Sequence, residues 1–145
     1  MTAATVLASM RNHLFYLALA FLTTSCSGGT SRIEARAMKN PVEPTPKSIA
    51  SGKNVYNKYC ADCHGETGNG IGSKTAMLAE TGQGKPSDLT DDKWEHGSTD
   101  GEIFVNIRDG VGVNGVMKGL NGKPGISDTD MWNMVNYIRT LKRGQ

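Results

Sequence analysis

Cys60-Ala61-Asp62-Cys63-His64 follows a segment whose apolar residues recur at helical spacing. Residues three apart on a helix share a face, so Cys60 and Cys63 can both reach one flat partner. His64 comes next and can point an imidazole nitrogen at the same partner. Two thiols and an imidazole in C-x-x-C-H order are the signal for covalent attachment of a c-type haem. The sequence therefore predicts one haem c, held by two thioethers and with His64 as the proximal iron ligand.

Three other interpretations of these cysteines compete with haem attachment. A structural zinc site needs four ligands, and outside this stretch the chain offers only His96, His13 and Cys26. A thioredoxin-like redox pair would follow a strand and precede a βαβ pattern, and the sequence predicts neither. A chance match or a plain disulfide is the third alternative. The surrounding sequence favours haem.

The second iron ligand is expected among the seven methionines. A thioether paired with histidine raises the reduction potential of haem iron and suits electron carriers. Met131 and Met134 fall on a predicted helix, where a role in the core is the ordinary one. Met77 lies between glycine-rich stretches, whereas Met117 lies in a loop from which it can reach the far face of the ring. Met117 is therefore the preferred ligand and Met77 the alternative.

Residues 1–25 predict an export signal. Leu14–Leu22 is an apolar run that suits a signal peptide and is too short to span a bilayer, and Arg11 precedes it. Cys26 follows small residues, which resembles a bacterial lipoprotein signal, in which the cysteine is lipidated and becomes the mature N-terminus. The alternative is an ordinary cleaved signal that leaves Cys26 as a free thiol. Met10 is a second candidate start.

Residues 26–47 are expected to form a flexible tether, because they contain Gly-Gly and three prolines and lack apolar periodicity. The folded domain is therefore predicted over residues 48–145. Net charge is +2, but from Ser48 onward 11 Lys and Arg stand against 12 Asp and Glu, so the domain is slightly acidic. It has no basic stripe, which argues against nucleic-acid binding.

Three helices are predicted in the domain, separated by glycine-rich loops. Thr45 or Ser48 can cap the first, Thr99 and Glu102 can form a capping box at the second, and Ser127 can cap the third. Their expected ranges are about 46–59 (starting at 46 or 49), 100–109 and 128–141. A short helical turn is expected near residues 75–78 and no strand is predicted, so the fold class is all-α.

From about Ser48 to Leu141 the chain resembles a class I cytochrome c. The matching residues are Gly52 and Tyr56 before CADCHG, Gly110-Val111-Gly112 before Met117, and Trp132, Met134 and Tyr137 near the end. The resemblance implies a cytochrome c-like fold of about three main helices around one covalent haem, in which the first and last helices cross. It also implies Met117 as the axial ligand, although Lys118 stands where the family usually has proline.

The resemblance implies further haem contacts. The family has a proline whose carbonyl accepts the N–H of the proximal imidazole, and Pro86 is the residue that matches it. Trp94 and Arg108 are candidates to bind the haem propionates. The alternatives are a packed surface tryptophan and a solvated arginine. His96 is expected to be a surface loop residue and not a ligand.

The chain is therefore expected to be an exported electron-transfer protein and not an enzyme. Its haem iron, held by His64 and Met117, is expected to alternate between the ferric and ferrous states. We expect it on the periplasmic side, anchored in a membrane by lipid on Cys26. Redox proteins would be its partners, with neither nucleic acid nor a small-molecule substrate. One alternative is a haem-bearing subunit of a dehydrogenase or oxidase complex. The other is an open-site, peroxidase-like enzyme, which would need Met117 to be detachable.

Overall fold

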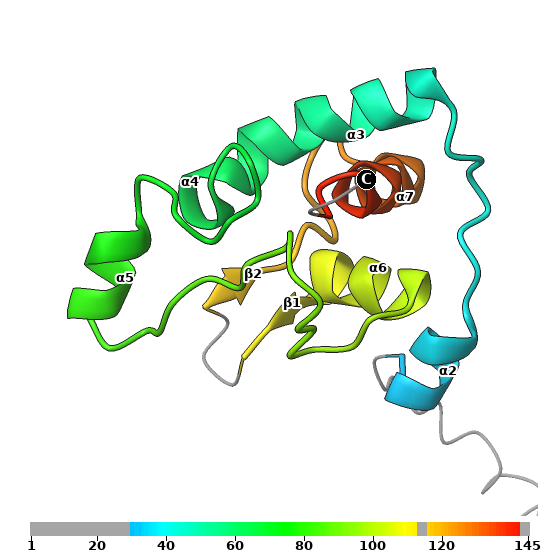
Figure 1. The fold of residues 1–145 in the computed structure, drawn as a ribbon. Coiled ribbons are helices and arrows are strands. Elements are labelled where there is room, and N and C mark those ends of the chain that lie inside the picture. Colours follow the sequence, from blue (N-terminus) through cyan, green and yellow to red (C-terminus); the bar gives the residue numbers. More distant parts are fainter. Residues whose placement is uncertain (1–29, 113–115, 143–145) are drawn as a thin grey trace, which may run out of the picture.

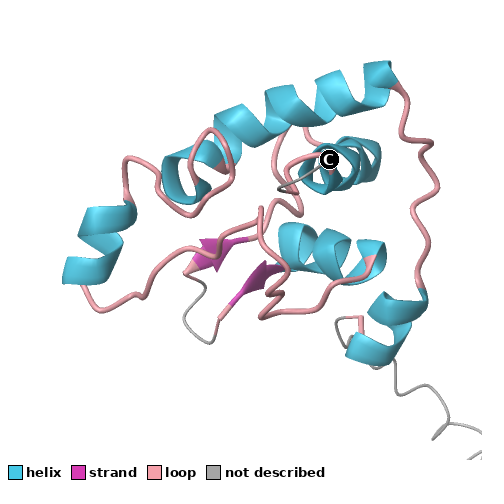
Figure 2. Ribbon diagram, viewed as in Figure 1, coloured by secondary structure: helices cyan, strands magenta, loops and turns pink. Residues whose placement is uncertain are grey.

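The computed structural model describes residues 30–112 and 116–142 and is mostly helical (Figures 1 and 2). In chain order the elements are α2 (Arg32–Ala37), α3 (Pro46–Tyr59), α4 (Ala61–His64), α5 (Thr75–Glu80), α6 (Asp100–Asp109), β1 (Gly110–Val111), β2 (Met117–Lys118) and α7 (Asp128–Arg139). The predicted export signal, Met10 and Cys26 lie outside the described residues. Within the described part of the chain, no helix is long and apolar enough to cross a membrane.

The helix α3 lies across α7, and this crossing joins segments that are far apart in the sequence (Figure 1). Gly52 and Tyr56 of α3 are buried there. A Cβ atom on Gly52 would overlap the backbone carbonyl of Asn133, so only glycine allows the two backbones to approach this closely. The ring of Tyr56 meets that of Tyr137 edge to face, with 5.2 Å between centroids. The predicted crossing of the first and last helices is confirmed.

Each of the three predicted helices begins at a side chain that accepts a backbone N–H. Thr45 caps α3 in this way. Thr99 and Glu102 form a capping box at the start of α6, and Ser127 and Asp130 form another at α7. These local polar contacts fix where the helices start, as the sequence predicted. The predicted short turn near residues 75–78 is the six-residue helix α5.

The core lies between α3, α6 and α7. Phe104 of α6 stacks flat on Trp132 of α7, with 4.0 Å between ring centroids and 5° between the planes. The buried apolar residues form one cluster: Tyr56, Ile103, Phe104, Ile107, Leu120, Met131, Trp132, Met134, Val135, Tyr137 and Ile138. Since most of these side chains come from the three helices, burial of their apolar surface holds the helices together as one rigid unit.

The strands β1 and β2 form a two-residue antiparallel pair that the sequence did not predict. Gly110 pairs with Lys118, and Val111 pairs with Met117. Gly110 also ends α6 with a φ of 86°, a left-handed conformation that glycine adopts without strain. A pair this short shows no alternation of apolar and polar residues, so no sequence pattern could indicate it. The pair fixes the backbone of Met117 beside the end of α6.

Residues 30–47 differ from their prediction, because they lie on the folded domain instead of forming a flexible tether. The helix α2 begins with a capping box at Ser31, and Ala35 is buried. The Asn40 side chain donates a hydrogen bond to a backbone carbonyl of α7. These contacts involve one small apolar residue and several polar ones, so apolar periodicity could not reveal them. We call residues 31–45 the N-terminal strap.

Candidate haem site

Cys60 and Cys63 lie at the junction of α3 and α4, about one helical turn apart. Cys60 ends α3, where its N–H donates to the carbonyl of Tyr56, and it also precedes the first residue of α4. Both are half-buried free thiols, and neither forms a disulfide within the described residues. Burial, and then the neighbouring Cys63, raise the pKa of the Cys60 thiol to about 12. The two sulfurs are thus placed on one short segment, as thioether attachment to a flat ring requires.

The Cys60 sulfur also contacts the last helix. Its Sγ lies 3.5 Å from the Sδ of Met134, whose side chain is fully buried in α7. The sequence assigned Met134 only to the core and to the helix crossing. Because that crossing places α7 directly against Cys60, the packing of α3 on α7 also fixes the position of the first attachment sulfur.

His64 is held by a backbone carbonyl from a loop more than twenty residues later in the chain. Its Nδ1 lies 3.0 Å from the carbonyl oxygen of Ser87. Burial lowers the pKa of His64, and the hydrogen bond to Ser87 opposes that effect. A neutral imidazole that donates a hydrogen bond from Nδ1 keeps a lone pair on Nε2. Within residues 30–112 and 116–142, no hydrogen bond to the Nε2 of His64 is found. Nε2 is therefore available to a metal, and Ser87 fixes the ring orientation.

The carbonyl that binds the imidazole belongs to Ser87 and not to Pro86, so the sequence prediction was wrong by one residue. The Pro86 carbonyl instead faces Gly70, 2.7 Å from the position that a Cβ atom would take. The Leu89 N–H donates to the carbonyl of Gly68 at 2.7 Å and ties the two loops together. Which carbonyl of a loop points inward depends on the φ and ψ of several residues, and these cannot be obtained from the position of one proline.

Tyr56 has a second role that sequence reasoning missed. Its hydroxyl donates to the carbonyl of Gly65, the residue after His64, at 2.7 Å. Burial raises the pKa of Tyr56, so the hydroxyl remains a donor at neutral pH. Through this bond the α3–α7 crossing is connected to the backbone that carries the imidazole. A tyrosine about one helical turn before C-x-x-C-H is the sequence signal for it.

The methionines occupy different environments. Met131 and Met134 are buried in the core with 2% and 0% exposure, as the sequence predicted for α7. Met77 on α5 is 49% exposed, whereas Met117 on β2 is half-buried and packs against the core cluster. These environments favour Met117 over Met77, and coordination of iron by Met117 stays a prediction.

The candidate propionate ligands both have protein contacts. The Trp94 side chain is half-buried, and the guanidinium carbon of Arg139 lies 5.4 Å from the centroid of its ring. The Arg108 guanidinium binds the carboxylate of Asp109 and the hydroxyl of Thr30. These contacts place Arg108 beside the first described residue of the chain, and propionate binding by Trp94 or Arg108 stays a prediction. His96 is exposed in a loop, as expected.

The model of a protein family described as cytochrome c oxidase, cbb3-type, subunit III matches residues 47–138. The chain belongs to this family. The matched range begins inside α3 and ends in α7. It therefore contains the two cysteines, His64 and Met117, and it excludes the N-terminal strap. The resemblance of the chain to class I cytochrome c is confirmed.

Two relatives of this chain are both named as the subunit CcoP of a cbb3-type cytochrome c oxidase. The cbb3-type cytochrome c oxidase subunit CcoP of Azospirillum brasilense is 30% identical over 105 residues, which are 66% of this chain and 32% of the relative. The subunit CcoP of Azospirillum sp. (strain B510) is 30% identical over 103 residues, 65% of this chain and 31% of the relative. The chain thus spans about a third of the length of these relatives.

One solved structure supports the fold. A chain of the Kuenenia stuttgartiensis reducing HAO-like protein complex superimposes with a TM-score of 0.57 at 24% identity. The match covers 73% of this chain and 50% of that one. At this identity the likeness concerns the fold alone, and it agrees with the mostly helical cytochrome c-like architecture.

The residues of this cytochrome domain fit a covalently bound haem c. Two cysteines stand about one turn apart, and a neutral imidazole follows with its Nε2 open and its Nδ1 fixed by Ser87. In the described ranges, no group of three or more His, Cys, Asp or Glu side chains could hold a metal ion directly. Two cysteine sulfurs for the ring and an imidazole with an open Nε2 suit an iron that is held inside a porphyrin, with His64 as one ligand.

Proposed function

We propose that this chain is an electron-transfer protein that carries one haem c with His64 and Met117 as axial ligands. The observation that carries the proposal is the geometry of His64, whose Nδ1 is bound to the Ser87 carbonyl while its Nε2 remains open, directly after two free cysteines. When bound, the haem supplies a one-electron Fe(III)/Fe(II) couple.

Each protein residue has a separate task in this proposal. Cys60 and Cys63 hold the ring by thioethers, which makes the cofactor permanent. The Ser87 carbonyl keeps the His64 ring in one orientation and increases its basicity. Met117 closes the second axial position, so that small ligands are excluded and only electrons pass. The rigid core limits the rearrangement of ligands between the two oxidation states.

The names of the relatives favour a place in a larger assembly. Both are subunits of a cbb3-type cytochrome c oxidase, although this chain matches only about a third of their length. We therefore propose that the partners are redox proteins, and that the chain serves as a haem-bearing subunit or as a carrier to such a complex. Anchoring on the periplasmic side of a membrane, through lipid on Cys26, is part of the same proposal.

The cofactor is tested on the full chain, produced in cells that contain haem-attachment machinery. Haem should remain on the polypeptide through denaturing electrophoresis, and intact mass should show one haem per chain. Cys60→Ala with Cys63→Ala should leave the chain without covalent haem. Haem that is lost on denaturation, or a mass with two haems, would contradict the proposal.

Carbon monoxide separates the carrier from an open-site enzyme. The ferrous protein should bind carbon monoxide poorly, because Met117 fills the site. Ready binding by the wild-type protein would favour the peroxidase-like alternative. Mass spectrometry of the mature N-terminus tests the anchor: acyl chains on Cys26 are expected, and an unmodified start elsewhere would refute lipidation.

A further inference from the structure

The N-terminal strap has a fixed position on the domain. Ala35 of α2 is 2% exposed, and its carbonyl lies so close to Gly101 of α6 that a Cβ atom on Gly101 would overlap it. Beside this contact, the Nε of Arg36 donates to the carboxylate of Glu102 at 3.3 Å. A helix that packs backbone to backbone and is flanked by an ion pair cannot rotate freely on its partner. One face of α2 is therefore set toward α6 and the other toward the surroundings.

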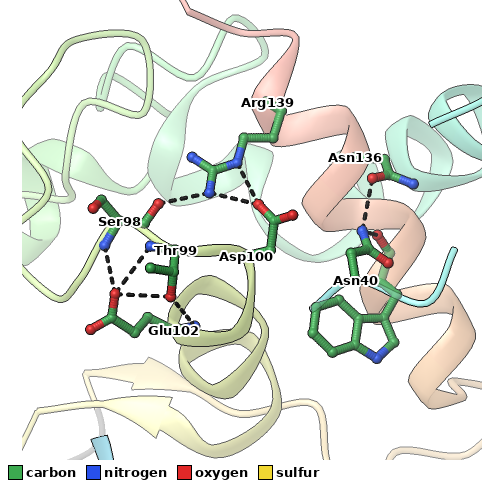
Figure 3. A network of polar contacts seen from close by, with 8 residues as sticks. Asn40, Ser98, Thr99, Asp100, Glu102, Asn136 and Arg139 are labelled. Atoms are coloured by element: carbon green, nitrogen blue, oxygen red, sulfur yellow. Dashed lines mark hydrogen bonds and ion pairs between the residues drawn. The ribbon is translucent and has the colours of Figure 1, made fainter. Parts of the chain in front are cut away.

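The second half of the strap is bound to α7 by a partly buried polar network. The Asn40 side chain donates to the Asn136 side chain at 2.7 Å (Figure 3). Asn136 in turn donates to the carbonyl of Val42 at 2.9 Å and to the hydroxyl of Ser48 at 2.8 Å. Within the described residues, no buried side-chain nitrogen or oxygen lacks a hydrogen-bond partner. Such a network is worth most when complete, so the strap is part of the rigid domain.

The exposed side of the strap carries basic side chains and one apolar side chain. We call Arg32, Ile33 and Lys39 the α2 surface; Arg36 is not part of it, because its guanidinium is paired with Glu102. Ile33 is 84% exposed, and Arg32 and Lys39 are also exposed. Residues 30–47 contain four basic residues (Lys and Arg) and two acidic ones (Asp and Glu). The chain from Ser48 onward contains 11 basic and 12 acidic residues. The positive charge of the folded part is thus concentrated around the strap.

The α2 surface lies close in sequence to the segment expected to reach the membrane. Only five peptide steps separate Cys26 from Ser31, which an extended chain covers in about 17 Å. Thr30, just before the strap, is itself tied to Arg108 through a hydrogen bond of 2.7 Å. A lipid on Cys26 would therefore hold α2 near the headgroups, instead of allowing the domain to move at the end of a long tether.

The attachment cysteines lie far from this surface. Figure 1 shows α2 at one end of the molecule and α4 with α5 at the opposite end. Segments that are widely separated in one view are at least that far apart in space. If α2 faces the membrane, the end of the domain that carries Cys60, Cys63 and His64 faces away from it.

We propose that the α2 surface lies on the anionic headgroups of the membrane and so turns the haem end of the domain toward the aqueous phase. Arg32 and Lys39 would bind phosphate groups, and Ile33 would enter the boundary between headgroups and acyl chains. The inference rests on the proposed function, and it adds that the redox partner approaches from the aqueous side. The strap, which lies outside the family match, is then the part that determines orientation.

Hydrogen exchange on the full, haem-bearing protein tests this orientation. The protein is placed on vesicles of phosphatidylcholine alone and on vesicles that also contain phosphatidylglycerol. We expect amides of residues 32–39 to exchange at least about fivefold more slowly on the anionic vesicles. The helix α5 is the internal control, since it also has six residues and lies at the other end of the molecule, and its exchange should not change.

Two charge reversals sharpen the result. Arg32→Glu should abolish the slower exchange of residues 32–39, whereas Lys85→Glu, an equal charge change in an exposed loop after α5, should leave it intact. Equal exchange on both kinds of vesicle, slowing at α5 in place of α2, or the same effect from both variants would overturn the proposal. A haem spectrum recorded on each sample distinguishes failure of the orientation from failure of the proposed function. Slower exchange of α2 in a protein without haem would refute the proposed function. Bound haem without slower exchange of α2 would refute the orientation.

Discussion

The backbone carbonyl of Asn133 in α7 occupies the space in which any side chain at position 52 of α3 would begin. Gly52 therefore permits a direct contact between two helix backbones. One turn later Tyr56 is fully buried, and its hydroxyl reaches the residue after His64. The crossing thus determines both the fold and the position of the haem-binding segment.

Gly52→Ala should destabilise the protein strongly. The added methyl group would overlap a carbonyl that belongs to a helix, which cannot give way as a flexible side chain can, so we expect a loss of at least about 3 kcal/mol. Urea unfolding followed by far-ultraviolet circular dichroism measures the change. Lys53→Ala, at the next and exposed position of α3, should stay within about 0.5 kcal/mol of wild type. A stable Gly52→Ala protein would show that the helices can separate at this point.

The parts of the fold that the sequence predicted correctly are those encoded locally. Thr45, Thr99 and Ser127 start helices through contacts with residues three positions later, so their signal is short-range and was recognised. The resemblance supplied the crossing at Gly52, because helix-on-helix contact is a long-range property that periodicity alone does not indicate.

The parts that were missed depend on contacts between distant residues. Asn40 binds α7 across more than ninety positions, and nothing near Asn40 in the sequence indicates such a partner. The acceptor for His64 was placed at Pro86 in place of Ser87 because a loop carbonyl is aimed by backbone angles and not by residue type. A lone polar residue in a proline-bearing segment is typical of a linker, so the strap could be recognised only in three dimensions.

Removal of Asn40 should release the strap. Asn40→Ala deletes hydrogen bonds to the Trp132 carbonyl and to Asn136, and it leaves buried polar groups unpaired, so we expect a loss of about 1–3 kcal/mol. Hydrogen exchange over residues 31–45 should become faster, while α7 remains protected. Asn54→Ala, at an exposed position of α3, is the control and should change neither quantity. Unchanged exchange in Asn40→Ala would mean that α2 alone holds the strap.

Glu102 should make part of the stability depend on pH. Hydrogen bonds from Thr99, with help from Arg36, hold the pKa of Glu102 below its ordinary value of 4.5 in the folded state. A group whose pKa is lower in the folded than in the unfolded state favours folding above the unfolded pKa, and this contribution is lost as pH falls through the folded value. Glu102→Ala should therefore cost about 1–2 kcal/mol at neutral pH and much less under acid conditions.

Urea midpoints of wild type and Glu102→Ala, recorded from neutral pH to below pH 4.5, measure that difference. The two curves should converge as the pH falls. Glu95→Ala, in the exposed loop before α6, should run parallel to wild type. A constant gap between wild type and Glu102→Ala at every pH would show that the lost contribution is packing and not the charge of the carboxylate.

Met117, and not Met77, is expected to be the second axial ligand of the iron, opposite His64. Met117 is half-buried in a strand pair that is anchored at the end of α6, while Met77 is half exposed on α5. Ferric protein with a sulfur–iron bond has a weak near-infrared charge-transfer band, and Met117→Leu should remove it. Met117→His should also remove the band and lower the reduction potential, because paired histidines favour ferric iron more than histidine with methionine does.

Met77→Leu is the matched control, since it makes the same change of side chain at the other candidate. It should leave the band, the potential and the resistance to carbon monoxide unchanged, whereas Met117→Ala should open the iron to carbon monoxide. Loss of the band in Met77→Leu together with its survival in Met117→Leu would reverse the ligand assignment. The short strand pair argues against that outcome: Val111 pairs with Met117, so the strand register holds the thioether at one place beside the core.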